Sequence, residues 1–404
     1  MATQLSVLSF SNELAAKKLK RLSLAKLKLL ARTEGLEPGW EAIDASNKAL
    51  LVEELVKVSA EYETFVAQVI SMSLSDRISK CIGEIKQPDV FPSARSRRKT
   101  QAHFPGAARR AKRKRSEQHA TQRLFTALIP RALRAQVHIV PSGSGVCIAL
   151  NGTAGDTPLL GATILTCAHC IARDGDEDAP TIDRVGRHKN IVFADGTLCV
   201  ARCTCSDERT DCALLTVVHV LRVGASAGVP AVVPTLALAP PDVVGLPVVC
   251  IGNPFDWDLE AEDAARVPTQ LGFEPFMLSL GTIEEVEEES ARAAAAAASD
   301  AGAFQLGGTK HGCWTYWGHS GGALITARSE VAALHNSWDP DSPWAQRHAV
   351  SNEAVRGFLV ANGHGAACRG EDGTARTMSC ASATKAVAIN ALNCLESDSE
   401  DSDG

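Results

Sequence analysis

Three stretches decide the fold of this 404-residue chain: GATILTCAHC at 161–170, RTDCALLTV at 209–217 and WGHSGGALI at 317–325. Each joins a strand-like apolar run to one polar residue, which is His169 in the first, Asp211 in the second and Ser320 in the third. A hydroxyl is a poor nucleophile at neutral pH unless an imidazole takes its proton and a carboxylate orients that imidazole. The three segments therefore predict a catalytic triad, and their chain order is one of the known arrangements.

Glycines surround Ser320, and this placement has a chemical reason. Main-chain N–H groups can converge on a developing oxyanion only where no Cβ obstructs the turn. The turn that carries the serine hydroxyl therefore also suits the stabilisation of negative charge on a substrate oxygen.

The chain between about 126 and 340 is built from short apolar runs separated by Gly, Pro, Asn or Asp. Runs of this kind predict strands of an all-β barrel or sandwich. We expect strands within 136–143, 145–152, 161–169, 190–196, 197–205, 212–218, 247–254, 277–283, 321–327 and 330–336.

Two segments interrupt that β pattern. Residues 284–303 contain five Glu followed by six consecutive Ala, which favours a helical or disordered insertion between strands. Residues 351–363 predict one closing helix, with Ser351 or Asn352 as its cap and Gly363 as its stop.

The ordered segments resemble the chymotrypsin-like serine peptidases, and among them the HtrA/Deg type. The likeness runs through GSGVCIAL, TILTCAHCI, IVFADGTLCVARC, TDCALLTV, VGLPVVCIGNPF, LSLGTIEEV and GHSGGALI, in the order of that family. It implies a mainly β fold of two six-stranded barrels, with a triad between them. The remainder at 363–404 is too short for the PDZ domain that is common in that family.

The resemblance also assigns roles to residues of this chain. Ser320 would be the nucleophile, His169 the general base and then acid, and Asp211 the orienting carboxylate. The N–H groups of Gly318 and Ser320 would form the oxyanion hole. An extended substrate would pair with the strand at 331–338. The residues expected to contact substrate are Trp314, His335, Asn336, Ser337 and Asp339.

Several residues depart from the pattern of that family. His319 stands where digestive relatives place an Asp that pairs with a newly cut N-terminus, so activation by N-terminal cleavage is not expected. Trp314, Tyr316 and Trp317 crowd the loop before the nucleophile. They would narrow the specificity pocket, hold the oxyanion loop inactive until something binds, or simply pack between loops. Asp207 is the alternative to Asp211 as the triad acid.

The first 86 residues predict a helical module. Residues 11–32 place leucines near helical spacing with lysines between them, and a second helical pattern starts after Ser46 and Asn47. This pair, within 11–58, resembles the SAP module, a small helix–turn–helix that binds DNA. An amphipathic helix pair that packs on itself or on another protein is the alternative interpretation.

The net charge of −6 conceals a basic segment, because residues 94–115 hold ten Lys/Arg and no acid, and the rest of the chain therefore carries −16. Such a density of charge predicts a solvated linker, here 87–125. Tracts of this kind act as nuclear import signals or neutralise phosphates, and a merely soluble linker is the alternative. The residues assigned to this role are Arg109, Arg110, Lys112, Arg113, Lys114 and Arg115.

The thirteen cysteines are irregularly spaced, and no secretory signal precedes them. We expect reduced thiols in an intracellular protein. Cys199, Cys203, Cys205 and Cys212 lack a CxxC pair, which argues against zinc, so we expect no metal and no cofactor. Cys147 and Cys170 are candidates to meet near the histidine loop. No apolar stretch is long enough for a membrane span, and we expect a soluble protein.

These observations lead to one function and two alternatives. The chain is expected to be a serine endopeptidase with a peptidase domain at 126–362, acting on polypeptides in the nucleus or on chromatin. The first alternative is a silent peptidase fold that only binds. The second is an organelle Deg-type protease, with residues 1–32 as a chloroplast or mitochondrial transit peptide; a cytoplasmic location is also open. The tail at 363–404 ends in acids and serines.

Overall fold

The structure is a computed structural model that describes residues 68–69, 71–85, 125–140, 143–150, 154–171, 184–222, 232–241, 243–255, 271–286, 308–339 and 346–364. The predicted helical hairpin at 11–58, the basic residues 109–115 and the acidic tail lie outside these ranges. No helix in the described ranges is long and apolar enough to cross a membrane.

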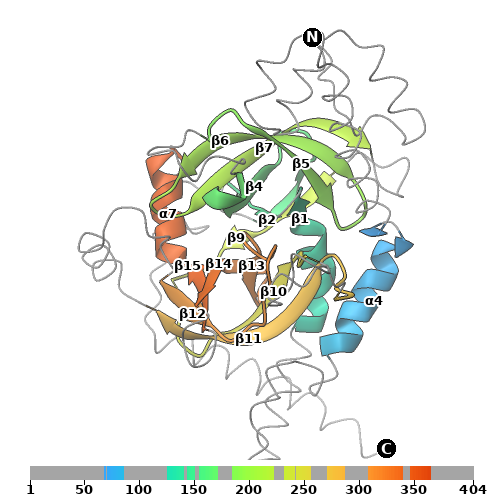
Figure 1. Cartoon of the computed structure of the whole chain (residues 1–404), viewed down its shortest axis with the longest axis vertical. Helices are drawn as coiled ribbons and strands as arrows, with labels where there is room; N and C mark the ends of the chain where they lie inside the picture. Colours follow the sequence, from blue (N-terminus) through green and yellow to red (C-terminus); the bar gives the residue numbers. More distant parts are fainter. Residues whose placement is uncertain are drawn as a thin grey trace, which may run out of the picture.

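The first half of the peptidase region closes into a six-stranded antiparallel barrel (Figure 1). Its strands follow one another around the barrel in the order β1, β2, β4, β7, β6 and β5, and β5 pairs back onto β1. Their bounds are β1 Gln136–Ile139, β2 Ser144–Cys147, β4 Thr163–Cys167, β5 His188–Phe193, β6 Leu198–Asp207 and β7 Cys212–Arg222. Alternation places Cys203 inside the barrel, while Arg202 and Thr204 on either side of it are exposed.

The second half forms another closed six-stranded barrel. Its order is β13, β10, β11, β12, β15 and β14, and β14 closes the ring by pairing with β13. Its strands are β10 Pro247–Gly252, β11 Met277–Val286, β12 Thr309–His311, β13 Ala323–Thr326, β14 Glu330–Asp339 and β15 Gln346–Val350. The short β9 (Ala237–Leu238) adds to β14 in parallel, and β3 (Gly155–Pro158) pairs with β8 (Val232–Thr235) as a separate ribbon.

The two barrels confirm the mainly β, double six-stranded architecture expected from the sequence. Each of the ten expected strand segments overlaps an observed strand. The sequence does not predict β3, β8, β9, β12 and β15, because these strands are short and several, such as Thr309–His311, are polar. Strand β11 runs through Val286, so it takes in the first three residues of the range predicted for the Glu/Ala insertion.

One hydrophobic core joins the barrels. Its buried side chains come from both, and they include Ile139 and Leu214 from the first barrel and Ile251 and Leu334 from the second. Because apolar side chains of both barrels share this cluster, neither barrel can move far without exposing it to water. The junction between the barrels is therefore well suited to hold a site built from residues of both halves.

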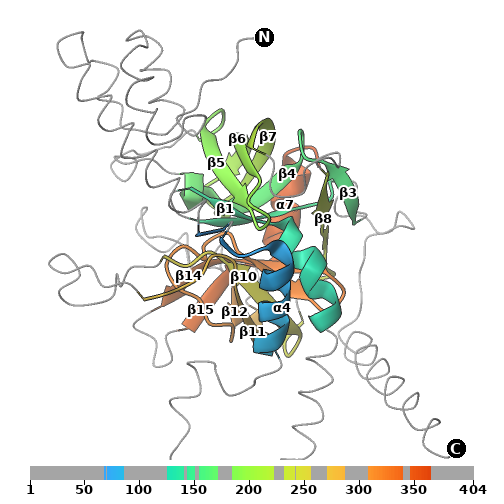
Figure 2. The same cartoon turned by 90° about the vertical axis from the view of Figure 1, so that its right-hand side faces the viewer.

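Helices cover the barrels at three places (Figures 1 and 2). The closing helix α7 (Asn352–Ala361) is confirmed, with Ser351 as its N-cap because the Ser351 hydroxyl accepts from the Ala354 N–H at 3.1 Å. Gly363 follows the helix with a φ of 81°.

The sequence does not predict a helix at 125–135, where Pro130 lies inside the pattern. Its buried face includes Phe125, Ile129 and Leu133, each four residues from the next. This helix leads directly into β1.

Helix α4 (Leu74–Ile85) packs against the second barrel. Ser73 caps it by accepting from the Asp76 N–H at 3.1 Å. Arg77 is buried and donates to the Pro275 carbonyl at 2.8 Å, beside the start of β11. Part of the region expected as a separate helical module therefore lies on the barrel surface.

We expect Phe358→Ala to destabilise the fold, because Phe358 of α7 is only 2% exposed and lies in the shared core. The expected loss is about 3–5 kcal/mol of unfolding free energy, measured by chemical denaturation. Val360→Ala is the matched control, since Val360 is 57% exposed on the same helix and its truncation should change stability by no more than about 0.5 kcal/mol. Equal effects of the two changes would contradict the packing of α7.

Candidate active site

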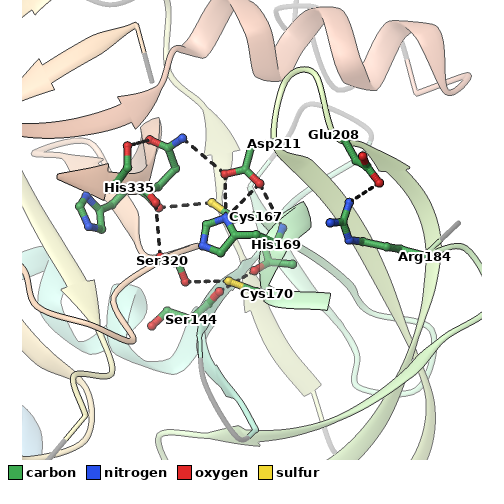
Figure 3. Close-up of polar contacts among 12 residues, drawn as sticks. Ser144, Cys167, His169, Cys170, Arg184, Glu208, Asp211, Ser320 and His335 are labelled. Atoms are coloured by element: carbon green, nitrogen blue, oxygen red, sulfur yellow. Dashed lines mark hydrogen bonds and ion pairs between the residues drawn. The ribbon is translucent and has the colours of Figure 1, made fainter. Parts of the chain in front are cut away.

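Residues from both barrels meet at their junction (Figure 3). His169 lies in the 3-10 turn η5 (Ala168–Ile171) that follows β4, and Asp211 immediately precedes β7. Both belong to the first barrel. Ser320 belongs to the second, in the turn that leads into β13. Antiparallel pairing of β4 with β7 sets Cys167 opposite Cys212, which brings the residues that follow and precede them together.

Asp211 holds His169 through the ring atom Nδ1, which is shared between both carboxylate oxygens, and through the backbone N–H. Nδ1 lies 2.9 Å from Oδ2 and 3.0 Å from Oδ1, and the backbone N–H of His169 donates to Oδ1 at 3.1 Å. With Nδ1 facing a carboxylate, the proton of the neutral ring is on Nδ1, and Nε2 is left as an acceptor. The histidine side chain is 32% exposed, whereas that of Asp211 is 10% exposed.

The charge environment favours protonation of His169. Burial alone would lower its pKa, but Cys170 and the Asp211 carboxylate outweigh burial and raise the pKa of His169 well above its ordinary value. Cys170 and Asp211 therefore stabilise the imidazolium that forms when this ring accepts a proton.

Asp211 and its alternative Asp207 have different surroundings. Asp211 has a φ of 52°, a left-handed conformation that Asp tolerates better than most residues, and its Oδ2 also accepts from Asn336 Nδ2 at 3.4 Å. Asp207 accepts from the Thr210 hydroxyl at 2.9 Å and from the Arg209 N–H at 3.0 Å. Asp207 therefore closes a local turn, and the carboxylate that contacts the histidine is that of Asp211.

Ser320 lies in a tight turn that only glycine permits on its C-terminal side. Gly321 has a φ of 82°, and a Cβ there would overlap the Ser144 carbonyl oxygen. The Gly321 N–H donates to the His335 carbonyl at 2.8 Å, which ties the turn to β14. The Ser320 hydroxyl itself makes a long hydrogen bond of 3.4 Å to the Asn336 carbonyl.

Gly318 has a backbone conformation that favours glycine. Its φ is 92°, and a Cβ at this position would overlap the Asn253 carbonyl oxygen. The Trp317 carbonyl accepts from the Phe255 N–H at 2.8 Å. In a planar trans peptide the C=O and N–H point in opposite directions, so the N–H of Gly318 points away from Phe255.

Ser144 of the first barrel holds this loop, and the sequence did not single it out. Its hydroxyl donates to the Gly318 carbonyl at 2.9 Å and accepts from the Asn253 N–H at 2.9 Å. Its backbone N–H donates to the Ser320 carbonyl at 2.7 Å. The sequence does contain a signal at this place, the Gly-Ser-Gly at 143–145, but that motif predicts only part of a strand.

Three buried histidines lie beneath the nucleophile turn in the second barrel. His311 Nε2 lies 3.1 Å from His335 Nδ1, and the His319 and His335 rings are 6.4 Å apart. Burial lowers the pKa of His311 and of His319 to about 3, and it lowers the pKa of His335 well below its ordinary value. These rings are neutral at physiological pH, and His335 is buried instead of exposed to a substrate.

Trp314 and Tyr316, in the loop before Ser320, pack with neighbouring rings, whereas Trp317 is 49% exposed. The rings of Trp314 and Tyr316 are stacked, and Phe273 from the turn before β11 packs against both. The Trp314 ring also meets the edge of His319 at 5.6 Å. Of the three interpretations offered by the sequence, packing between loops describes these contacts.

The last part of β14 carries the other residues expected to contact substrate. Asn336 and Ser337 are buried, and Asp339 pairs in register with Gln346 of β15. Pairing with β13 covers residues 331–334 of β14 only, so beyond His335 that side of the strand has no partner among the described strands.

The cysteines of the described ranges are all free thiols. Cys147 lies near Cys199, whereas the Cys170 sulfur donates to the Ser320 carbonyl at 3.3 Å. Among the described residues, one group of three could share a single ion, and it consists of Cys167, His169 and Asp211. The four cysteines considered for zinc do not form such a group within the described ranges.

Two closed β-barrels with a serine, a histidine and an aspartate at their junction define a chymotrypsin-like serine hydrolase fold. Residues 143–334 match the family described as the trypsin-like peptidase domain. This part of the chain is therefore a trypsin-like peptidase domain, as the sequence motifs led us to expect. No curated protein matches the chain.

Solved structures similar to the chain include two proteases. One is the serine endoprotease from Yersinia pestis, with 18% identity over 59% of this chain and 65% of that chain, and a TM-score of 0.36. The other is the inactive form of the Rv3671c protease, with 17% identity over 59% of this chain and 93% of that chain, and a TM-score of 0.37. The chain thus covers less than two thirds of the Yersinia pestis enzyme.

We expect His169 to titrate above the ordinary histidine range, as measured by NMR of the histidine ring protons. Asp211→Asn should lower the pKa of His169, because the change removes a negative charge and an acceptor next to Nδ1. Asp207→Asn should leave the pKa of His169 unchanged, since Asp207 is engaged in its own turn. An unchanged pKa in Asp211→Asn would contradict the assigned contact.

Proposed function

We propose that this chain is a serine endopeptidase that hydrolyses peptide bonds through His169, Asp211 and Ser320. The observation that carries the proposal is the pair of hydrogen bonds from His169 Nδ1 to Asp211, which leave Nε2 as a proton acceptor on the side of the nucleophile turn. The trypsin-like peptidase domain at 143–334 supports the same reaction class.

The reaction begins with proton transfer. His169 Nε2 takes the proton of Ser320 as Oγ attacks the carbonyl carbon of the scissile bond. The carbonyl π electrons move to oxygen, and the resulting oxyanion is stabilised by the N–H groups of Gly318 and Ser320. His169 is now an imidazolium, which Asp211 stabilises across Nδ1.

The intermediate then collapses in two stages. The imidazolium gives its proton to the leaving amine as the C–N bond breaks, and an acyl ester remains on Ser320. Water attacks that ester, and His169 takes its proton. The second collapse releases the new carboxylic acid and returns the proton to Ser320 Oγ.

Substrate binding is proposed along β14 beyond His335, where β15 pairs with the strand and, among the described strands, β13 does not. An extended peptide would add along this segment, main chain to main chain. The Asn336 carbonyl, which accepts from the Ser320 hydroxyl, lies at the start of this segment. Asn336, Ser337 and Asp339 remain the proposed substrate contacts, whereas Trp314 and His335 would act on the substrate by shaping the loop and strand next to it.

We expect a fluorophosphonate probe to label the purified full chain, because the probe reacts with a serine activated by a neighbouring base. Ser320→Ala should abolish labelling, and His169→Ala should slow it by at least about 10³-fold. Ser351→Ala is the matched control, since Ser351 is a buried serine that caps α7, is not among the residues of the site, and is expected to leave labelling in place. Labelling that survives Ser320→Ala, or folded protein that is never labelled, would favour the silent peptidase fold that only binds.

A second proposal concerns where the enzyme works. Ten Lys/Arg within 94–115 suit nuclear import or phosphate binding, and DNA-bound proteins would then be among the substrates. We expect a fluorescent fusion of the full chain to accumulate in the nucleus and to lose that signal when 94–115 are deleted. Deletion of 1–32 serves as the comparison. Organelle targeting that depends on 1–32 and ignores 94–115 would contradict nuclear import.

A further inference from the structure

Three different metal-ligating groups converge beside the catalytic histidine. Atoms of Cys167, His169 and Asp211 lie within 4.8 Å of one another. Figure 3 shows the Cys167 sulfur beside the His169 ring, next to the carboxylate of Asp211. Thiolate, imidazole and carboxylate are the ligand types that Zn²⁺ and related transition-metal ions prefer in proteins.

We propose that a divalent transition-metal ion of the zinc type binds to Cys167 Sγ, His169 Nδ1 and Asp211, and that it reversibly blocks the triad. A site of three protein ligands leaves the fourth tetrahedral position for water. Metal binding does not depend on the proposed peptidase function, whereas the inhibition rests on it.

The spacing of the ligand atoms suits such an ion after small shifts. Bonds of about 2.0–2.3 Å in a tetrahedral site place two ligand atoms roughly 3.5 Å apart. Nδ1 and the Asp211 oxygens are 2.9 and 3.0 Å apart, so they need only separate slightly. The ligand atoms lie within 4.8 Å of one another, so the sulfur needs to approach by about 1.3 Å at most, within the reach of a side-chain rotation. Access is through His169, whose side chain is 32% exposed.

An outer hydrogen bond already orients one of the ligands. Asn336 Nδ2 donates to Asp211 Oδ2 at 3.4 Å, and partners of this kind fix the direction of a ligand and raise metal affinity. The Cys167 thiol donates to the His335 carbonyl at 3.4 Å, which sets the direction of the sulfur in the metal-free protein, and this hydrogen bond is given up when the thiol ionises. Cys167 and Asp211 are buried, and the partly exposed His169 leaves access for the water in the fourth position.

The proton balance explains why the ion would inhibit. The Cys167 thiol releases its proton to solvent and binds as a thiolate. The proton on Nδ1 moves to Nε2, so that Nδ1 can use its lone pair for the metal. Nε2 then carries hydrogen and cannot accept the proton of Ser320. The bound enzyme therefore lacks its general base, and removal of the ion restores it without any covalent change.

The neighbouring Cys212 provides a matched control. It is fully buried like Cys167 and lies opposite it in the β4–β7 register. It is not part of the group of three ligands. A site that depends on Cys167 and ignores Cys212 would be specific to the proposed geometry and not a general property of buried thiols.

The test uses Co²⁺ as a spectroscopic substitute for zinc on the full chain carrying Ser320→Ala, which cannot digest itself. We expect a sulfur-to-cobalt charge-transfer band in the near ultraviolet. Cys212→Ala should keep the band. Cys167→Ala should lose it and weaken Zn²⁺ binding, followed by calorimetry, at least about tenfold, because even outer partners of metal ligands contribute 10–100-fold. Absence of the band, or its persistence in Cys167→Ala, would overturn the proposal.

A second measurement keeps the test decisive if Cys167→Ala does not fold. Cys167→Ser preserves the size of the side chain, and circular dichroism checks that it folds. Like Cys167→Ala, Cys167→Ser should lose the sulfur-to-cobalt charge-transfer band. In the chain that keeps Ser320, Zn²⁺ should prevent fluorophosphonate labelling, and a chelator should restore it. Cys167→Ser should need at least about tenfold more Zn²⁺ for the same inhibition. Equal inhibition of the chain with Cys167 and of Cys167→Ser would overturn the role of Cys167. A chain that binds Co²⁺ through Cys167 but is never labelled would instead refute the peptidase proposal alone.

Discussion

The geometry of the turn around Ser320 depends on one set of hydrogen bonds between the barrels, made by Ser144. Its hydroxyl bridges the Gly318 carbonyl and the Asn253 N–H, and its backbone N–H holds the Ser320 carbonyl. These bonds fix the nucleophile turn of the second barrel against the strand next to the histidine loop of the first. They are buried, where an unmet polar group costs about 1–3 kcal/mol, so the loop has little freedom to adopt another pose. The close approach leaves no room for a side chain at Gly321.

Near these hydrogen bonds, burial sets the charge state of several titratable groups. His311, His319 and His335 remain neutral because burial lowers their pKa, and the Cys167 thiol keeps its proton because burial and the nearby Asp211 raise its pKa. His169 differs, since the groups around it outweigh burial and raise its pKa. Among these histidines, His169 is therefore the one whose surroundings stabilise the form that has accepted a proton, as transfer from a serine requires. The same low-dielectric environment would strengthen the electrostatic attraction between a metal ion and the ligands Cys167, His169 and Asp211.

Periodicity and turn residues predicted most of the architecture. Runs such as 212–218 and 247–254 are long, apolar and bounded by turn residues, so their strands could be predicted. Strands such as β12 and β15 could not, because neighbours and not their own composition stabilise them. The helix at 125–135 was missed for the opposite reason: Pro130 argues against a helix locally, but burial of Phe125, Ile129 and Leu133 overrides it. Contacts of α4 with the second barrel depend on Arg77 and Pro275, which no local pattern connects.

The sequence by itself determined the fold class, the candidate triad residues and their order, because strand patterns and glycine-rich turns are local properties of the chain. Only the tertiary structure shows that Asp211, which the strand pattern favoured over Asp207, contacts His169, whereas Asp207 closes a local turn. It likewise revealed Ser144 as the residue that holds the turn around Ser320, and it brought Cys167 to the histidine and the carboxylate. These relations join residues far apart in the chain, and they arise from barrel closure and shared burial, which no short stretch of sequence encodes.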